Sequence, residues 1–165
     1  WNCSWDATAN PSIVGSVHTT LSVLEAFADY KKYGYTYRLD DINKKVIKGQ
    51  EYLLKRDLYK SLKTNESIHK DMISFHYPTR WKYDCFRALE YFVDIDHKYD
   101  AHMKDALELL KTAIHKRYIN KGKAYAGKTH FVLETGQKSR FNTYRALRII
   151  KAYDHKFYQY LLSQD

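Results

Sequence analysis

The sequence contains few of the residues that interrupt helices: only two prolines and six glycines occur among 165 residues. An all-β chain needs many tight turns, and tight turns rely on both residue types. The scarcity therefore disfavours an all-β fold and favours helices joined by a few short breaks. The chain also has no apolar run close to the roughly 20 residues that cross a bilayer, so we expect a folded domain without a membrane span.

Cysteine is scarce too, and the two cysteines, Cys3 and Cys85, lie far apart in the sequence. Two distant cysteines do not form the disulfide framework that is typical of small secreted domains. We therefore expect reduced thiols and a cytoplasmic location.

Complete catalytic signatures are also absent. The sequence has no glycine-rich phosphate loop, no Gly-x-Ser-x-Gly elbow, no Cys-x-x-Cys pair and no His-Glu-x-x-His unit. Each of these motifs places a nucleophile, a phosphate group or a metal ligand in a defined geometry. The sequence accordingly predicts no cofactor and leaves enzymatic activity open.

Positive charge is plentiful but dispersed. The formal net charge of +9 raises nucleic acid as a partner, because clustered Lys and Arg gain free energy by releasing counterions from phosphates. The basic residues instead form scattered pairs interleaved with acids, a pattern typical of solvated helix faces. These pairs are Lys31-Lys32, Lys44-Lys45, Lys55-Arg56 and Lys116-Arg117. Nucleic acid is therefore not the expected partner.

Helical periodicity is the main positive signal in the chain. Sixteen tyrosines add amphipathic aromatic surface that can complete a core or line a cavity. The apolar pattern predicts one all-α domain over residues 1–165, with an irregular lead-in and five main helices. The lead-in spans residues 1–16, and the helices are expected near residues 16–33, 39–56, 80–94, 99–118 and 140–153.

Smaller features are expected around these helices. Asp40 or Asp41 can cap the second helix, because a side-chain oxygen can accept the free N–H groups that open a helix. Ser139 or Asn142 can cap the fifth helix in the same way. The other expectations are a short helix at Leu58 to Leu62, a short extended piece at His130 to Glu134 and a resumption of the last helix to Leu162.

The predicted helices alternate in character. The first, third and fifth are apolar nearly all round, whereas the second and fourth are apolar on one side. Short segments also echo one another at intervals of about 60 residues. The echoes are Val23-Leu24-Glu25-Ala26-Phe27, Ala88-Leu89-Glu90-Tyr91-Phe92 and Ala146-Leu147-Arg148-Ile149-Ile150. The pattern predicts repeated helical hairpins, arranged as a closed α/α toroid or an open solenoid.

Several motifs resemble one protein family. They are Trp1-Asn2-Cys3, His18-Thr19-Thr20-Leu21-Ser22-Val23-Leu24-Glu25, Tyr77-Pro78-Thr79-Arg80-Trp81-Lys82-Tyr83-Asp84, Arg87-Ala88-Leu89, Lys128-Thr129-His130-Phe131, Ser139-Arg140-Phe141-Asn142-Thr143 and Arg145-Ala146-Leu147. In order and spacing they resemble uncharacterised bacterial proteins of the squalene-cyclase and protein-prenyltransferase type. The resemblance implies an α/α toroid whose inner helices line an aromatic cavity for isoprenoid chains. A complete toroid needs more hairpins than this chain supplies, so we expect a partial toroid.

The chain departs from that family at its diagnostic residues. Squalene cyclases carry an Asp-x-Asp-Asp acid, and the nearest matches here are Asp40-Asp41 and Asp94-Ile95-Asp96, which are better explained by helix ends. Prenyltransferases bind zinc through Asp, Cys and His. Adjacent Asp84 and Cys85 lie about 100° apart on a helix and cannot easily share an ion. We expect no metal, the alternative being a site formed by Cys3, His18 and Asp84.

Polar and aromatic residues on the inner helices are the candidates for a site. The catalytic candidates are Asp84, Glu134 and His18, and the ligand-binding candidates are Trp1, Trp5, His18, Trp81, Tyr83, Asp84, Arg87, His130 and Arg140. A buried charge without a partner is costly, so each such group needs a partner or a ligand. The structural alternative is that Asp84 and Glu134 pair with Arg87, Arg140 or Arg145.

Three functions remain open at this point. The chain can bind a hydrophobic or isoprenoid ligand in an aromatic cavity, act as a non-catalytic binding or scaffolding module, or act on carbohydrate through paired carboxylates. Half a toroid would also expose an apolar flank, so we expect either self-association or packing against a missing N-terminal half.

Overall fold

The computed structural model describes residues 1, 14–114, 117–122 and 130–164. In this part of the chain the fold is all-α, as predicted, with six α-helices and one two-stranded ribbon. The α-helices are α1 (Val17–Lys32), α2 (Leu39–Leu54), α3 (Cys85–Asp94), α4 (Lys104–Ala113), α5 (Arg140–Tyr153) and α6 (His155–Leu162). Two short 3-10 helices, η1 (Lys70–Ile73) and η2 (Ala101–Met103), precede α3 and α4. Strands β1 (Ile119–Asn120) and β2 (Lys138–Ser139) pair antiparallel, with Ile119 opposite Ser139.

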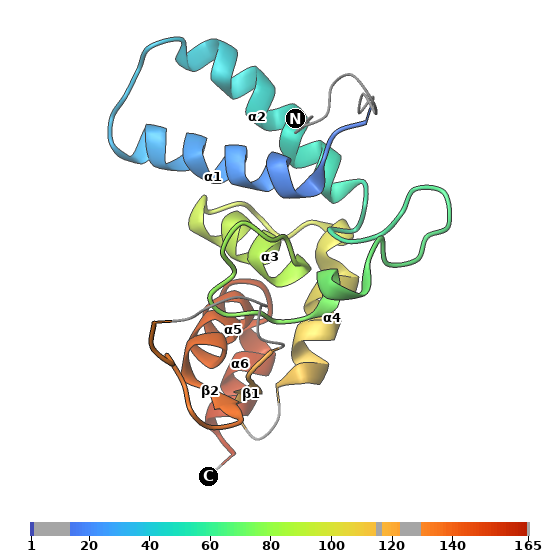
Figure 1. Cartoon of the computed structure of the whole chain (residues 1–165), viewed down its shortest axis with the longest axis vertical. Coiled ribbons are helices and arrows are strands. Elements are labelled where there is room, and N and C mark those ends of the chain that lie inside the picture. Colours follow the sequence, from blue (N-terminus) through green and yellow to red (C-terminus); the bar gives the residue numbers. More distant parts are fainter. Residues whose placement is uncertain (2–13, 115–116, 123–129, 165) are drawn as a thin grey trace.

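The helices form hairpins that stack on one another. Helix α1 pairs with α2, α3 with α4, and α5 with α6. Figure 1 shows the α1–α2 pair at the top, α3 and α4 in the middle, and α5 and α6 below. Helix α3 contacts both α1 and α5, so the first, third and fifth helices follow one another through the molecule. The sixth helix completes a third hairpin, in agreement with the expected resumption to Leu162.

Helix α3 is the most enclosed element. Cys85, Phe86, Leu89 and Phe92 are fully buried, as expected for a helix covered by neighbours on two flanks. Helices α1 and α5 are less enclosed than their sequences predict, and Tyr144 on α5 is 65% exposed. Each of them meets α3 on one flank only, because the stack of described helices ends with their hairpins.

Three helix boundaries differ from the predicted ones. Helix α3 begins at Cys85 instead of residue 80, because Asp84 has extended backbone and its Oδ1 accepts a hydrogen bond from the N–H of Arg87 at 2.7 Å. The predicted helix at 99–118 is shorter, since α4 ends at Ala113 and the chain then extends toward β1. Residues 58–62 are not helical, because Leu58 adopts a left-handed backbone with φ of 67°.

The capping predictions have mixed outcomes. Ser139 caps α5, and its Oγ accepts from the N–H of Asn142 at 3.0 Å. Asp40 and Asp41 do not cap α2. The helix begins at Leu39, so Arg38 occupies the N-cap position. Both carboxylates therefore occupy the first turn, where the helix dipole still favours negative charge. The extended piece expected at residues 130–134 is not a strand.

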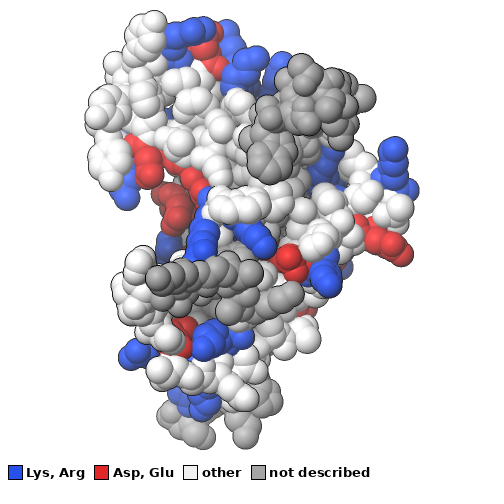
Figure 2. Space-filling model, viewed as in Figure 1, with Lys and Arg blue, Asp and Glu red and all other residues white. Residues whose placement is uncertain are grey.

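Charge is spread over the visible surface. On the face shown in Figure 2, Lys and Arg are interspersed with Asp and Glu instead of gathering over one helix. None of the helices in the described ranges is long and apolar enough to cross a membrane.

Candidate functional site

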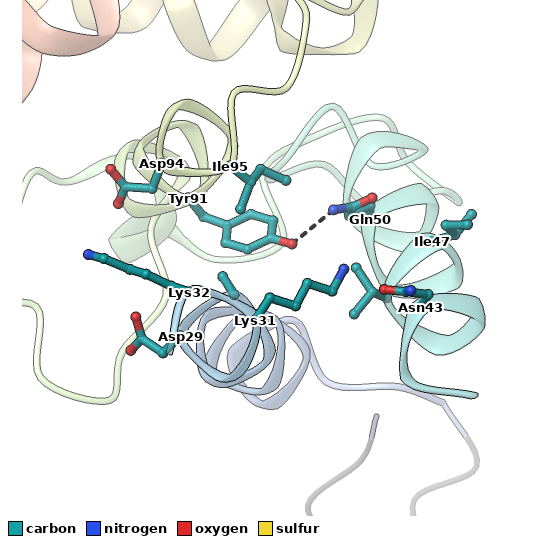
Figure 3. A pocket seen from close by; sticks show the side chains of 11 residues that line it. Asp29, Lys31, Lys32, Asn43, Ile47, Gln50, Tyr91, Asp94 and Ile95 are labelled. Carbon is teal, nitrogen blue, oxygen red and sulfur yellow. Dashed lines mark hydrogen bonds between the residues drawn. The ribbon is translucent and has the colours of Figure 1, made fainter. Parts of the chain in front are cut away.

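A roomy groove lies between the first hairpin and the end of α3. Its volume is about 850 Å³, and residues of α1, α2 and α3 line it (Figure 3). We call it the α1–α2–α3 groove. Its lining residues are Ala28, Asp29, Lys31, Lys32, Asn43, Val46, Ile47, Gln50, Tyr91, Asp94 and Ile95.

A glycine makes room for Trp1 in the first hairpin. A Cβ added at Gly49 of α2 would lie 2.5 Å from the Trp1 ring and 3.1 Å from a methyl group of Leu24. Real Cβ atoms essentially never come within 2.5 Å of another heavy atom, so glycine at this position leaves the room that the Trp1 ring occupies beside α2. Trp1, a ligand-binding candidate, therefore packs into the hairpin, with its ring 6.0 Å from that of Phe27.

The floor of the groove is apolar with one polar anchor. Tyr91 is 3% exposed, and its hydroxyl accepts a hydrogen bond from Gln50 Nε2 at 2.9 Å, which joins α3 to α2 (Figure 3). Burial raises the pKa of this phenol above its ordinary value. Val46 is also buried, whereas Ile47 is 55% exposed beside them. The groove thus offers an apolar surface that solvent can reach.

Charged side chains form the rim. In Figure 3 the ammonium group of Lys31 points toward the side of Gln50 and Asn43, and that of Lys32 toward the side of Asp94. Asp94 forms an ion pair with Arg148. Because this carboxylate is already compensated, only Asp29 opposes the two lysines among the residues that line the groove.

A second hollow collects several of the candidate residues. It measures about 230 Å³ and lies between the start of α1, η1 and the segment that leads into α3. We call it the histidine pocket. It is lined by His18, His69, Asp71, Met72, His76, Trp81, Lys82 and Tyr83. The structure therefore brings together the candidates His18, Trp81 and Tyr83, and it adds His69, Asp71 and His76.

His18 is held in one protonation state. Its Nδ1 accepts a hydrogen bond from the N–H of Tyr83 at 2.8 Å. Burial, followed by the nearby charges of Arg87, Lys82 and His69, lowers the pKa of His18 below its ordinary value. The neutral imidazole with its hydrogen on Nε2 is therefore the favoured form. The Tyr83 hydroxyl points elsewhere and donates to the carbonyl of Leu58.

The carboxylate of Asp84 lies near His76, one of the residues that line this pocket. It is fully buried, and Oδ1 caps α3 through the N–H of Arg87. Oδ2 makes no hydrogen bond and lies 3.9 Å from Nδ1 of His76, which is itself buried. The expected pairing of Asp84 with the Arg87 guanidinium is wrong, because that guanidinium forms an ion pair with Glu25 of α1.

Glu134 plays a similar part at α5. Its Oε1 accepts from the N–H groups of Arg140 at 2.6 Å and Phe141 at 3.4 Å, so this carboxylate also binds helix-opening amides and does not pair with an arginine side chain. Arg145 pairs with Glu90 instead, at 2.6 Å. None of the described pockets is lined by both Asp84 and Glu134.

The remaining candidates lie apart from both hollows. Arg140 lines a separate pocket of about 560 Å³ beside the stacked rings of Tyr77 and Phe141. His130 is exposed. Trp5 and Cys3 lie outside the described residues, so the alternative metal site with Cys3 is not tested. Within the described ranges no three His, Cys, Asp or Glu side chains are placed to hold a metal ion.

Sequence reasoning did not identify the α1–α2–α3 groove. None of its lining residues is among the candidates, because each one looks like an ordinary helix residue on its own. One sequence feature could have indicated the groove: Tyr91 places a hydroxyl group among the apolar residues of the central helix. Lys31 and Lys32 line the same groove.

Comparisons with known proteins add no identification. No protein-family model matches the chain, and neither the curated proteins nor the solved structures that were searched contain a match.

Proposed function

We propose that this chain is a helical-hairpin domain that binds a hydrophobic ligand with an anionic head group in the α1–α2–α3 groove. The resemblance of its motifs suggests an isoprenoid chain as the hydrophobic part, and a partial α/α toroid as the architecture. The observation that carries the proposal is the combination of an apolar floor with two lysines on the rim of the same groove.

The size and lining of the groove support a chain-like ligand. Sites for small molecules typically enclose roughly 300 to 1,000 Å³, with mostly apolar walls and a few polar groups that orient the ligand. The groove of about 850 Å³ lies within this range. Ile47 and Ile95 come from different helices, so a flexible apolar chain lying between them would remove both from water.

The charges on the rim support an anionic head group. Lys31 and Lys32 lie in the last turn of α1, where they also compensate the partial negative charge of the helix end. A phosphate or diphosphate bound at either ammonium group would form charge-assisted hydrogen bonds. A neutral alcohol with the same chain would lack these interactions and would bind more weakly.

The scaffolding module is the second candidate function, and one observation favours it. The buried acids and arginines that looked functional mostly have structural partners: Asp84 and Glu134 cap helices, while Arg87 and Arg145 pair with Glu25 and Glu90. A carbohydrate-active site with paired carboxylates has less support, since Asp84 and Glu134 serve different helices.

Calorimetric titration with farnesyl diphosphate and with farnesol, both below their aggregation concentrations, tests the proposal. We expect the diphosphate to bind more tightly than the alcohol. Ile47→Asn should weaken binding of the diphosphate about tenfold, because a difference of about 1.4 kcal/mol corresponds to a factor of ten and partial burial of one isoleucine is of this order.

Leu62→Asn is the matched control. Leu62 is 63% exposed and lies outside the groove, so this variant should bind like the unmodified protein. Equal weakening by both substitutions would indicate nonspecific hydrophobic adsorption. No heat of binding with either ligand at two temperatures would reject the proposal and favour the scaffolding module, because apolar burial gives heat at one of them through its heat-capacity change.

A further inference from the structure

We infer that the histidine pocket is a second ligand site and that it takes a single uncharged sugar ring. The pocket lies at the N-terminal ends of α1 and α3, whereas the α1–α2–α3 groove lies toward their C-terminal ends. The inference does not depend on the proposed function of the groove.

Two imidazole rings provide fixed hydrogen-bond donors. Nδ1 of His18 accepts from the N–H of Tyr83 at 2.8 Å, and Nδ1 of His69 accepts from the N–H of Asp71 at 3.1 Å. A neutral imidazole that accepts at Nδ1 carries its hydrogen on Nε2. Each ring therefore has an N–H left for a ligand oxygen, and no hydrogen bond from either Nε2 is found among the described residues.

The same pocket also provides hydrogen-bond acceptors. The carboxylate of Asp71 lines it, and its side chain is 28% exposed. Asp84 is not part of the lining, because its unbonded Oδ2 is fully buried 3.9 Å from Nδ1 of His76. The two oxygens of Asp71 are therefore the carboxylate acceptors that a ligand hydroxyl in this pocket can use.

The balance of charge favours an uncharged ligand. Besides its histidines, the lining has one basic side chain, Lys82, and one acidic side chain, Asp71. A lone phosphate or carboxylate would meet Asp71 unfavourably, and a cation would meet Lys82. A sugar hydroxyl both donates and accepts, so it can use the donors and the acceptors of this pocket together.

Trp81 supplies the apolar platform that a sugar ring needs. Its side chain is 67% exposed, and its ring lies 5.6 Å from that of His18 at an interplanar angle of 56°. An indole that stays exposed beside polar donors can cover the C–H face of a sugar while the hydroxyls bond to the rim. The volume of about 230 Å³ leaves room for one ring rather than for a chain.

Nuclear magnetic resonance of the full chain tests this inference. The indole N–H signal of Trp81 is assigned with Trp81→Phe, and glucose, galactose, mannose and N-acetylglucosamine are then titrated separately. We expect at least one sugar to shift the Trp81 and His18 signals saturably, with a millimolar dissociation constant. Trp81→Ala should weaken this binding at least tenfold.

Tyr144→Ala is the matched control, since Tyr144 is 65% exposed and lies outside the pocket. It should leave sugar binding unchanged. His18→Asn gives a second test that keeps Trp81, because asparagine preserves the acceptor for Tyr83 but removes the Nε2–H donor. The inference is overturned if none of the four sugars shifts these signals, or if inorganic phosphate at constant ionic strength shifts them and the sugars do not.

Discussion

The buried carboxylates Asp84 and Glu134 each bind backbone N–H groups at the start of a helix. The first N–H groups of a helix have no partner within the helix, and a buried carboxylate satisfies them with charge-assisted hydrogen bonds. At the scale of single residues, hydrogen bonds to helix-opening N–H groups therefore account for the burial of these two carboxylates. Oδ2 of Asp84 is an exception, since it makes no hydrogen bond and lies 3.9 Å from Nδ1 of the buried His76.

His18 leads to a prediction about pH. The pKa of His18 is lowered from 6.5 in the folded protein, mainly by burial, so the unfolded chain takes up a proton first as the pH falls. The neutral form therefore stabilises the fold fully above pH 6.5, and this stabilisation is lost as the pH drops below that value. Urea unfolding measured at several pH values should show this decrease.

His18→Asn is the comparison for this effect. Asparagine can still accept the hydrogen bond from Tyr83 but does not titrate, so the variant should lose the part of the pH dependence that is due to His18. If both proteins lose stability with the same slope between neutral and mildly acidic pH, His18 is not held neutral by the fold.

At the scale of elements, the hairpins are joined by a repeated ion pair. Glu25 of α1 pairs with Arg87 of α3, and Glu90 of α3 pairs with Arg145 of α5. Each arginine also donates to a carbonyl in the segment before α3, Arg87 to Lys82 at 2.9 Å and Arg145 to His76 at 3.1 Å. Consecutive inner helices are thus connected through the same kind of contact.

Arg145→Leu should destabilise the protein by about 3 kcal/mol, because it leaves Glu90 partly buried without its closest partner. The side chains of this pair are only 7% and 18% exposed, so solvent screens it little. The double variant Arg145→Leu, Glu90→Leu should recover part of the loss. A double-mutant cycle by urea unfolding measures the coupling, and additive losses would show that the pair does not join the helices.

The sequence predicts some elements more reliably than others, for physical reasons. Helix α5 is predicted at its observed bounds, because Ser139, one of the two caps considered, directly precedes a continuous apolar pattern. The start of α3 is predicted too early, since aromatic residues 81 and 83 continue the pattern although Asp84 ends it locally. The helix at 99–118 is predicted too long, because the pairing of β1 with β2 overrides its apolar stripe.

The candidate site also has parts that the sequence predicts and parts that it does not. His18, Trp81 and Tyr83 meet in one pocket, and unusual residue types mark them in the sequence. The α1–α2–α3 groove is formed by residues from three different helical segments, so it is a property of tertiary packing. No residue of the groove is unusual by itself, so sequence reasoning had little to find there.

At the scale of the whole molecule, the described part is a stack of three hairpins with its hollows at both ends of the inner helices. The stack leaves apolar side chains exposed, among them the consecutive residues Phe131, Val132 and Leu133. Association with a further hairpin or with a second copy would cover such residues. We therefore keep the partial α/α toroid as the proposed architecture.

Methyl-resolved NMR with farnesyl diphosphate can locate a ligand bound in the α1–α2–α3 groove. We expect intermolecular contacts from the prenyl chain to the methyl groups of Val46, Ile47 and Ile95, and none to Ile149, which is fully buried outside the groove. Contacts spread over exposed methyl groups elsewhere, such as Leu62 and Val132, or no contacts to the groove under saturating ligand, would contradict it.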